Sequence, residues 1–539
     1  MSQPFRFKRR SYGRLAIIFG GLFVISFATC YFIFDLIVDF IVKNNLNLKK
    51  GGIERGIYEA LPFPLTYQVY IFHILNKDEV KNGAKPHFKE MGPYSFDEID
   101  WKNNISDDEE EDTMSFNLNK EWLFRPDLSN GLTGEEIITT LHPVIVAIGL
   151  TAHFEMRQYL HVASTAIDEI FHEPKDVFWT GRAMDLISDG IEIDCSTTNP
   201  LAKIACRMIR KSGIQMIQRV DTQRMKFSFL GGFNRTVNGY WTMNRGIKNI
   251  YDAGNVVAVD GQRELTVWGK EGKCNQITGG DTLVFVPYQT IEKPMLMFVR
   301  QLCFTLQMKF VRKAIYRGID LHVFAQEFNI TATNEFSCFC RKPDRCPIQG
   351  TMDMYQCLKV PVIISQPHFY HADPSLLANI VDGLKPDQKK HEFAITLEMK
   401  TGVALKVAAR VQINFPLEPV AEIEIMKNLP NMTFPWVWAE KNMFQIPDSL
   451  VNLMKYTLTV GNIFRTTLAY LTWTIFFFGT IFCTTIFILT QYTEYDILED
   501  ERVFLRTSGI VKIEQVSAIN QNVVKEGNDL IKNEKRSRK

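Results

Sequence analysis

The chain has 539 residues, of which 46% are hydrophobic and 22% are charged, with a formal net charge of +1. These proportions are those of a globular protein. They exclude a disordered, collagen-like or nucleic-acid-seeking chain, whose charge or low complexity would stand out. The length fits three or four ordinary domains or one large one. We therefore expect no nucleic-acid partner.

Two uncharged segments lie near the ends of the chain. The first runs from Leu15 to Phe34 and the second from Thr466 to Thr493. Because a helix rises about 1.5 Å per residue, each can cross a bilayer. A cleaved signal peptide is the alternative for the first, but its apolar run is too long and no small-residue cleavage site follows. A buried core helix is the alternative for the second. We expect transmembrane helices at residues 15–36 and 466–490.

Lysine and arginine placement indicates the orientation of these helices. Residues 1–14 carry a net charge of +5, and the segment from Glu494 to the end carries none, which leaves −4 for residues 35–493. Both tails, residues 1–14 and 491–539, are therefore predicted to be cytoplasmic. Residues 37–465 are predicted to form an ectodomain outside the cell or in an organelle lumen.

Two further features fit this orientation. Asn-x-Ser/Thr acceptors for glycosylation, which require luminal exposure, occur only in the middle segment, at Asn104, Asn234, Asn329 and Asn431. Eight of the ten cysteines also lie there: Cys195, Cys206, Cys274, Cys303, Cys338, Cys340, Cys346 and Cys357. An even number in an oxidising compartment predicts a disulfide framework. We expect Cys195 and Cys206 to close a short loop on grounds of spacing.

A zinc site is the alternative for the last four of these cysteines. Their spacing does not match paired C-x2-C knuckles, so we assign no metal.

In chain order, the ectodomain is predicted to begin with sheet and continue with helices. Leu65–Leu75 is β-branched and aromatic, as a strand should be. Phe154–Phe171 has apolar residues at helical spacing. Further helical candidates are Asp176–Ser188 and Leu201–Gln218. We therefore expect an inserted helical bundle at about residues 135–220.

Strand patterns return after the helices. Met225–Leu230 and Arg263–Trp268 alternate polar and apolar residues, which is typical of half-buried strands. His391–Phe415 is predicted to form two strands that turn at Thr401-Gly402. The fold class is therefore α+β, with a mainly antiparallel β body.

Motifs for catalysis are absent from the sequence. It contains no G-x-S-x-G elbow, no H-E-x-x-H and no P-loop. We therefore expect neither an enzyme nor a cofactor. Three classes of function remain: a receptor or transfer protein, an adhesion protein, and a two-span ligand-gated ion channel.

The threonine-rich second span suits the channel, with Thr472, Thr474, Thr480, Thr484, Thr485 and Thr490. Threonines inside membranes commonly bond their own helix, however, and no ionisable residue lies in either span as a selectivity element.

Several long motifs resemble the class B scavenger receptor family, and the resemblance covers most of residues 10–490. They are NGAKPHFKEMGPYSFDE (Asn82–Glu98), SCFCRKPDRCPIQGTMDMYQC (Ser337–Cys357), PVIISQPHFYHADPSL (Pro361–Leu376) and LEMKTGVALKVAARVQINF (Leu397–Phe415). Within that family the chain looks most like the sensory neuron membrane proteins of insects, through Ser106–Phe124, Leu132–Ile138 and Gly190–Ser196.

The resemblance implies a β-barrel-like ectodomain with a membrane-distal helical bundle and an internal hydrophobic tunnel. Carried over by position, it implies the disulfides Cys274–Cys338, Cys303–Cys357 and Cys340–Cys346. It also implies a lipophilic odorant, pheromone or fatty-acid-like ligand, handed to membrane lipids or to an olfactory receptor, with an odorant-carrier protein as a further partner.

Basic residues near the expected bundle are candidates for ligand entry, since they would attract carboxylate head groups or acidic carriers. They are Lys175, Arg182, Lys203 and Arg207. The alternative is that they are solvated charges on helix surfaces. A general lipid or lipoprotein scavenger is the alternative function within the family.

The tails bear on localisation. Neither tail contains cysteine, which makes acylation there doubtful. Tyr495–Leu498 and Glu526–Ile531 resemble endolysosomal sorting signals, and a basic cluster at residues 532–539 would suit anionic lipid. We expect the plasma membrane, with an endolysosomal membrane as the alternative.

Overall fold

The computed structural model describes residues 3–269, 273–326, 328, 337–341, 346–443, 448–456 and 461–507. The chain divides into two compact units. The helical unit comprises Met1–Val38 and Val460–Lys539, and the barrel unit comprises Asp39–Thr459. Asn329, Glu526–Ile531 and the basic cluster at 532–539 lie outside the described residues.

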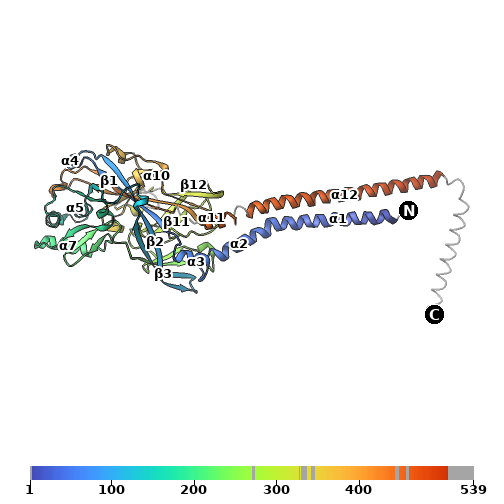
Figure 1. Cartoon of the computed structure of the whole chain (residues 1–539), viewed down its shortest axis with the longest axis horizontal. Coiled ribbons are helices and arrows are strands. Elements are labelled where there is room, and N and C mark those ends of the chain that lie inside the picture. The colour runs from blue at the N-terminus through green and yellow to red at the C-terminus, as the bar shows by residue number, and fades with distance from the viewer. Residues whose placement is uncertain are drawn as a thin grey trace. The chain divides into compact units, whose positions relative to one another are not determined.

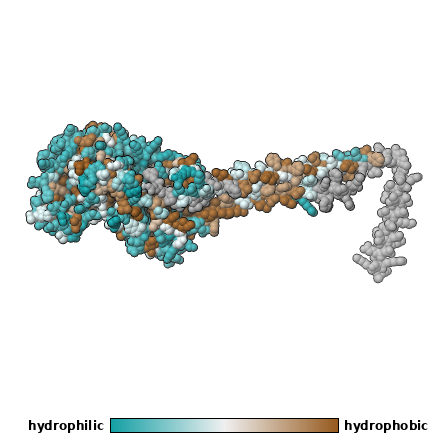
Figure 2. Space-filling model, in the orientation of Figure 1, coloured by the Kyte–Doolittle hydropathy of each residue, from teal (hydrophilic) through white to brown (hydrophobic). Residues whose placement is uncertain are grey.

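Two long apolar helices make up the described part of the helical unit. At the N-terminal end, α1 (Gln3–Ala28) continues through a π-helical turn, η1 (Thr29–Ile33), into α2 (Phe34–Asn45). At the other end α12 runs over Gly461–Thr507. Stretches of 35 and 40 residues in these helices are long and apolar enough to cross a membrane. Their apolar surface is visible in Figure 2, and the two terminal helices expected from the sequence are confirmed.

The two helices lie side by side within their unit (Figure 1). Tyr31 stacks on Trp473, with ring centroids 5.3 Å apart. In α12, hydroxyl groups donate to carbonyls three or four residues earlier, as Thr472, Thr474, Thr480 and Thr490 show. Four of the six threonines that suited a channel thus bond to their own helix backbone, and Thr472 also lies 2.7 Å from the Ser26 hydroxyl of α1.

A thirteen-stranded sheet forms the barrel unit, with the order β10-β9-β3-β2-β1-β18-β17-β16-β13-β12-β11 and the short strands β14 and β15 attached beside β17. All its strand pairs are antiparallel. The strands are β1 (Leu65–Ile74), β2 (Phe88–Asp108), β3 (Thr113–Phe124), β9 (Thr236–Asn244), β10 (Val256–Val259), β11 (Met295–Val299), β12 (Phe304–Tyr316), β13 (Ile319–Ala325), β14 (Thr351–Asp353), β15 (Ile363–Ser365), β16 (Ala394–Leu397), β17 (Ala404–Leu417) and β18 (Met432–Asn442).

The two edge strands of this sheet approach each other through a glycine pair. Val256 of β10 donates a backbone hydrogen bond of 2.8 Å to Gly279, and Gly280 donates one of 3.1 Å to Leu296 of β11. Phe298 donates back to Gly280 over 2.9 Å. The segment between the edges therefore nearly closes the sheet into a barrel, and the expected barrel-like α+β fold is confirmed.

Helices and small sheets gather at one end of the barrel unit, where Figure 1 labels α5 and α7, while β12 and α11 lie at the other end. They are β4 (Ile137–Leu141), α5 (Pro143–Glu155), η3 (Arg157–Tyr159), α6 (Leu160–Ile170), β5 (Phe178–Arg182), η4 (Asp185–Asp189), β6 (Ile191–Asp194), α7 (Pro200–Lys211), β7 (Ile217–Arg219) and β8 (Arg224–Phe227). The remaining α-helices are short: α3 (Ile53–Glu59), α4 (Lys77–Val80), α8 (Tyr355–Leu358), α9 (Ser375–Ala378), α10 (Gln388–His391) and α11 (Asp448–Met454).

Most strand predictions are confirmed: β1 matches Leu65–Leu75, and β16 and β17 flank the turn at Thr401-Gly402. The strand expected at Met225–Leu230 is confirmed only to Phe227, where β8 ends. The strand expected at Arg263–Trp268 is wrong. That segment forms turns with one isolated bridge, from Glu264 to Gln276. Its apolar residues are buried by tertiary contacts rather than by a neighbouring strand, since Leu265 and Val267 pack on the core and Trp268 packs on Phe339.

The helical predictions are partly confirmed. Phe154–Phe171 is helical from Leu160, after a break at Met156–Tyr159, and the third helix ends at Lys211 rather than at Gln218. The helix expected at Asp176–Ser188 is wrong in its first half, because Phe178–Arg182 forms β5 and pairs with β4, whereas Ala183–Ser188 is helical and includes most of the π-helical turn η4. Helix α5 was missed, because it is apolar on all sides and therefore has no helical periodicity to detect.

Candidate functional site

A cavity of about 970 Å³ lies inside the barrel unit. Its size is within the range of small-molecule sites, which is about 300–1,000 Å³. Side chains of α5–α7 and of the barrel strands line it together, and most of them are apolar, including Val144, Ile148, Phe227, Phe415 and Trp436. Such a lining suits a ligand with a long hydrocarbon part.

Helix α5 forms part of the cavity wall because it is buried on two opposite faces. Ala147 and Thr151 line the cavity on one side. On the other side Gly149 lies so close to Met426 that an added Cβ would be 2.3 Å from its sulfur. The absence of a side chain at Gly149 thus lets the helix approach the loop that covers it.

The cavity reaches the surface between η3 and α7. Tyr159 and Met208 both line it, yet their side chains are 49% and 47% exposed. Ile204, one turn before Met208 on α7, is 44% exposed. An exposed apolar rim of this kind is suited to the entry of a lipophilic molecule.

One side of the cavity wall carries a row of polar side chains, which we call the polar band. It crosses five neighbouring strands and consists of Lys441 on β18, Tyr67 on β1, Glu98 and Asp100 on β2, Lys120 on β3 and Asn238 on β9.

Strand register brings these residues together. Tyr67 lies opposite Lys441 in the β1–β18 pair, and Asp100 lies opposite Lys120 in the β2–β3 pair. In the β3–β9 pair, Asn238 lies at a register irregularity, between Val237, which is opposite Asn119, and Tyr240, which is opposite Asn117. Inward-facing residues alternate with outward-facing ones along each strand, so the band is continuous across the wall.

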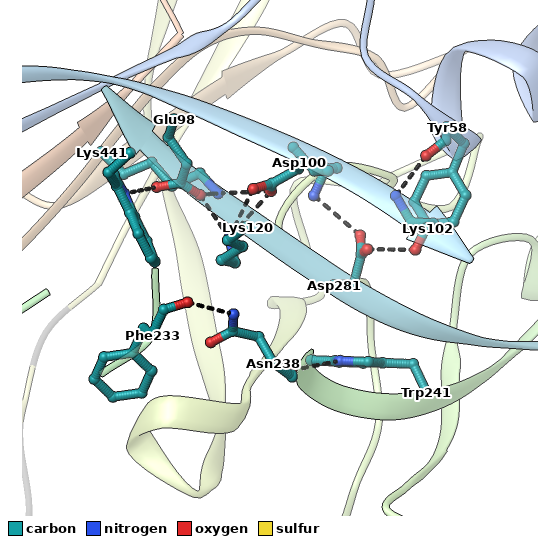
Figure 3. Close-up of polar contacts among 12 residues, drawn as sticks. Tyr58, Glu98, Asp100, Lys102, Lys120, Phe233, Asn238, Trp241, Asp281 and Lys441 are labelled. Carbon is teal, nitrogen blue, oxygen red and sulfur yellow. Dashed lines mark hydrogen bonds and ion pairs between the residues drawn. The ribbon is translucent and has the colours of Figure 1, made fainter. Parts of the chain in front are cut away.

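Ion pairs join the members of the band on β2, β3 and β18 (Figure 3). The Lys120 ammonium donates to a Glu98 carboxylate oxygen at 2.5 Å and to both Asp100 oxygens at 3.1 Å. The Lys441 ammonium donates to the same Glu98 oxygen at 2.8 Å. Trp122 donates its indole N–H to the other Glu98 oxygen at 3.1 Å. Two carboxylates and two ammonium groups thus balance in charge inside the wall.

Burial alone would raise the pKa of Glu98, but the Lys120 and Lys441 ammonium groups outweigh it and hold that pKa below its usual range. Burial would lower the pKa of Lys120, yet Asp100 and Glu98 raise it above the ordinary lysine value. Glu98 and Lys120 are therefore both charged at neutral pH.

A second polar cluster adjoins the band and ties helix α3 to the barrel. The Lys102 ammonium donates to the backbone carbonyl of Tyr58 and lies 3.7 Å from the centroid of its ring. The Tyr58 hydroxyl donates to Asp281. Burial lowers the pKa of Lys102 to about 8, although Asp281 and Asp100 oppose the shift.

The basic residues considered for ligand entry lie on the same end of the barrel unit as the opening, but none is a lining residue of the cavity. Lys203 and Arg207 are exposed on α7, and Lys175 is exposed in the loop before β5. Arg182 is held by Glu135 at 2.9 Å and by Asp185 at 2.6 Å.

The structure places four disulfides in the barrel unit. They join Cys195 to Cys206, Cys274 to Cys338, Cys303 to Cys357 and Cys340 to Cys346. Cys338, Cys340, Cys346 and Cys357, the four cysteines considered for a zinc site, all form disulfides and therefore do not bind zinc in this structure. Among the glycosylation acceptors that the structure describes, Asn104 and Asn431 are exposed. Asn234 is half-buried, and its side-chain oxygen accepts from the Trp122 backbone N–H at 3.0 Å.

In the described part of the chain, no three His, Cys, Asp or Glu side chains are grouped to hold a metal ion. His368 is a packed and hydrogen-bonded residue of the barrel unit, stacked on His391. Its Nδ1 accepts from the Lys385 backbone N–H at 2.9 Å, and its Nε2 lies 2.5 Å from Glu90.

A nearly closed barrel with an apolar cavity, carried between two apolar terminal helices, is the architecture expected of a class B scavenger receptor. Comparison of the sequence with family models agrees, since the CD36 family model matches residues 17–490. The chain belongs to the CD36 family of class B scavenger receptors, which are receptors and not enzymes. Its two terminal helices fit the two-span membrane proteins of that family.

Among curated relatives the chain is similar to Sensory neuron membrane protein 1 of several insects. It is 37% identical to that of Aedes aegypti over 439 residues, which cover 81% of this chain and 80% of the relative. It is 35% identical to that of Anopheles gambiae over 472 residues, which cover 86% of each chain. It is 35% identical to that of Manduca sexta over 461 residues, which cover 83% of this chain and 88% of the relative.

The polar band was missed in the sequence. The sequence feature that belongs to it is on β2, where the charged residues Glu98, Asp100 and Lys102 occupy alternate positions. Such alternation of charged residues normally marks the solvent face of a strand. Only closure of the barrel turns that face inward.

Proposed function

We propose that this receptor captures lipophilic odorants, pheromones or fatty-acid-like molecules and transfers them through its cavity to the membrane or to a neighbouring olfactory receptor. The observation that carries the proposal is the apolar cavity of about 970 Å³ that opens at an apolar rim. Similarity to Sensory neuron membrane protein 1 supports the sensory setting.

The physical reason for such a conduit is the poor solubility of long-chain molecules. Each methylene group contributes about 0.8 kcal/mol in favour of leaving water. A long-chain ester, aldehyde or alcohol therefore crosses an aqueous layer slowly unless an apolar surface receives it. A protein that offers an enclosed apolar cavity lowers that barrier.

Entry is proposed at α7. Lys203 and Arg207 lie on this helix beside the exposed apolar residues Ile204 and Met208. This combination would hold an acidic carrier protein by charge while its cargo meets the apolar rim. Lys175 is a further candidate on the same end of the unit, whereas Arg182 is engaged by acidic neighbours.

The topology proposed is plasma-membrane, with both tails cytoplasmic and the barrel unit outside the cell. The net charge of +5 on residues 1–14 supports it. Glycosylation is proposed first at Asn104 and Asn431, because both acceptors are exposed. A general lipid scavenger, at the cell surface or in endolysosomes, is the second candidate and rests on family membership.

The test is transfer of a fluorescent long-chain lipid from solution into liposomes that carry the full-length protein. Ala147 lines the cavity on α5, so Ala147→Trp should fill it and reduce the transfer rate about tenfold. Ala378→Trp is the matched control, because Ala378 is exposed on α9 and does not line the cavity. Transfer by the unaltered protein no faster than by protein-free liposomes would contradict the proposed conduit.

A further inference from the structure

We propose that a surface of the barrel unit beside α2 docks on the phospholipid bilayer at head-group level. We call this surface the interfacial patch, and it consists of Ile247, Tyr251, Tyr288 and Ile291. Three observations carry the inference: the attachment of the patch to α2, its exposed apolar side chains, and the lysines around it. The inference goes beyond the proposed function, since it holds whatever the cavity binds, and it takes the first span to end at residue 36, as expected from the sequence.

Polar contacts within the barrel unit attach the patch to Asp39 of α2. The Tyr288 hydroxyl donates to the Asp39 carboxylate at 2.9 Å, and the Lys400 ammonium lies 3.3 Å from the same oxygen. The Tyr251 ring lies beside the Tyr288 ring, with centroids 5.4 Å apart. The two tyrosines therefore bring two separate loops of the barrel unit to the side of α2.

The position of Asp39 sets the depth of the patch. Asp39 follows residue 36, the end of the expected span, by three residues in the same helix. Because a helix rises about 1.5 Å per residue, Asp39 is only about 4.5 Å beyond the hydrocarbon core. The head-group layer on each side of that core is about 5–8 Å thick. A surface that is bonded to Asp39 therefore lies at head-group level.

The patch is apolar where it is exposed. The side chains of Tyr251, Ile291 and Ile247 are 54%, 47% and 42% exposed. Single exposed apolar residues are common on protein surfaces and carry no meaning alone. Tyrosine is enriched at the boundary of lipid and water, however, because its ring meets the acyl chains while its hydroxyl stays among polar groups. An exposed tyrosine with two isoleucines at this depth fits lipid better than water.

Charge around the patch is complementary to phosphate. Four exposed lysines lie in the segments next to it: Lys43 on α2, Lys49 and Lys50 after that helix, and Lys293 after Ile291. Residues 43–50 and 291–293 contain one acidic residue, Glu292. Lysine side chains lay their apolar stems along a hydrophobic surface and extend their ammonium groups to its polar edge. An apolar centre with a basic border is the pattern of an interfacial membrane contact.

The experiment measures the depth of the patch in phosphatidylcholine liposomes that carry the full-length protein. A bimane fluorophore is attached to Ile247→Cys or to Tyr251→Cys, after Cys30→Ser and Cys483→Ser have removed the free cysteines. The quencher is a phosphatidylcholine with a nitroxide near the head-group end of one acyl chain. We expect about twofold quenching of either label, because interfacial side chains enter roughly 5–10 Å into this layer.

Val381→Cys, labelled in the same way, is the matched control. Val381 is also apolar and is 62% exposed. Its backbone N–H donates to Pro86 in the loop after α4, which lies at the end of the barrel unit that carries α5 (Figure 1). The nitroxide lipid should leave this label unquenched.

A second variant shows whether the native side chains, and not the label, cause the docking. With the label at Ile291→Cys, the double change Ile247→Ser/Tyr251→Ser should reduce nitroxide quenching by about half, since the apolar centre is lost. Equal quenching at the patch and at Val381, or no effect of the double change, would overturn the inference. A label that neither the nitroxide lipid nor aqueous iodide quenches would also overturn it, because a second copy of the chain would then cover the patch.

Discussion

Two buried histidines of the barrel unit are held in their neutral form by burial, and each accepts a hydrogen bond at its Nδ1 atom. His142 caps the start of α5, where its Nδ1 accepts from the Ile145 backbone N–H at 3.4 Å. The Nδ1 of His391 accepts from the Asp387 backbone N–H at 2.9 Å. Burial lowers the pKa of each to about 4, and the neighbouring His368 adds to the shift at His391.

These shifts make stability depend on pH in a defined window. The folded-state pKa lies below the unfolded value of about 6.5, so the stabilisation is complete above pH 6.5 and is lost as the pH falls toward 4. We expect each histidine to contribute roughly 2 to 3 kcal/mol to this loss. Replacement by asparagine keeps an acceptor near the Nδ1 position and removes the titration.

The double variant His142→Asn/His391→Asn should therefore show a shallower fall of Tm between pH 6.5 and 4.5 than the unaltered full-length protein. The slope is the readout, because loss of the ring contact between His142 and Phe171 also lowers Tm at every pH. Protonation of Glu98 does not affect this comparison. Because its pKa is lowered in the folded protein, it changes the free energy of unfolding only below about pH 4.5. Parallel curves for the two proteins would show that other groups control the acid response.

Single residues also show which structural roles can be predicted from the sequence. The eight ectodomain cysteines could be recognised as a disulfide set, because cysteine has few roles in an oxidising compartment. The burial of Asn238 inside β9 could not be predicted, because an Asn-Gly pair such as Asn238-Gly239 normally marks a turn. Its amide nitrogen donates to the Phe233 and Thr236 carbonyls, and the sequence alone does not show these contacts.

Among the elements, α7 is expected to depend on its disulfide more than the barrel strands do, because few of its residues are buried. Only Ala202, Ala205 and Cys206 of this helix are buried, while Ile204 and Met208 face outward. The Cys195–Cys206 disulfide closes a loop with a sequence separation of 11. A loop of that length is worth about 3 kcal/mol in the chain-entropy account.

Removing this disulfide with Cys195→Ala/Cys206→Ala should loosen α7 locally. We expect amide hydrogen exchange in α7 to become about a hundredfold faster, because about 3 kcal/mol of local stability is lost. Exchange in β1–β3 should not change. Hydrogen–deuterium exchange of the full-length protein measures both, with Cys483→Ala as the control, since Cys483 is a free cysteine. Faster exchange throughout the barrel would show that the disulfide supports the whole unit.

Element prediction from sequence succeeded where the pattern reports a single buried face. Helix α6 is of this kind, because its buried residues share one face: Leu160, Ala163, Ala166, Ile167 and Ile170. It failed where burial is two-sided or comes from tertiary contact, as in α5, whose two faces meet the cavity and Met426. At Phe178–Arg182, pairing with β4 overrides a pattern that resembled a helix.

For the whole molecule, the barrel is closed by contacts that no local pattern records. Strand β1 pairs with β18, so Tyr67 lies opposite Lys441 although most of the ectodomain sequence separates them. The pair Gly279-Gly280 then bridges β10 and β11. Closure is what encloses the cavity and turns the charged face of β2 inward. The polar band, and with it any ligand selectivity, is therefore a property of the closed barrel and not of one segment.

The closing contact can be tested with two glycines that share a backbone conformation but differ in surroundings. Gly279 has a φ of +84°, and a Cβ added there would lie 2.3 Å from the carbonyl oxygen of Leu296 on β11. Gly261 has a φ of +78° and no atom within 4 Å of an added Cβ. Gly261→Ala therefore measures backbone strain alone, which we expect to cost about 1 kcal/mol.

Gly279→Ala adds to that strain a clash with backbone that cannot turn aside, so we expect a loss of roughly 2 to 4 kcal/mol. The edge strands must separate to relieve the clash, which should also speed release of a bound apolar probe from the cavity. Thermal unfolding and probe dissociation rates of the two full-length variants measure the two effects. If both variants lose the same stability and release the probe at the unaltered rate, the glycine pair does not hold the barrel closed, and closure must come from the other contacts between the edges.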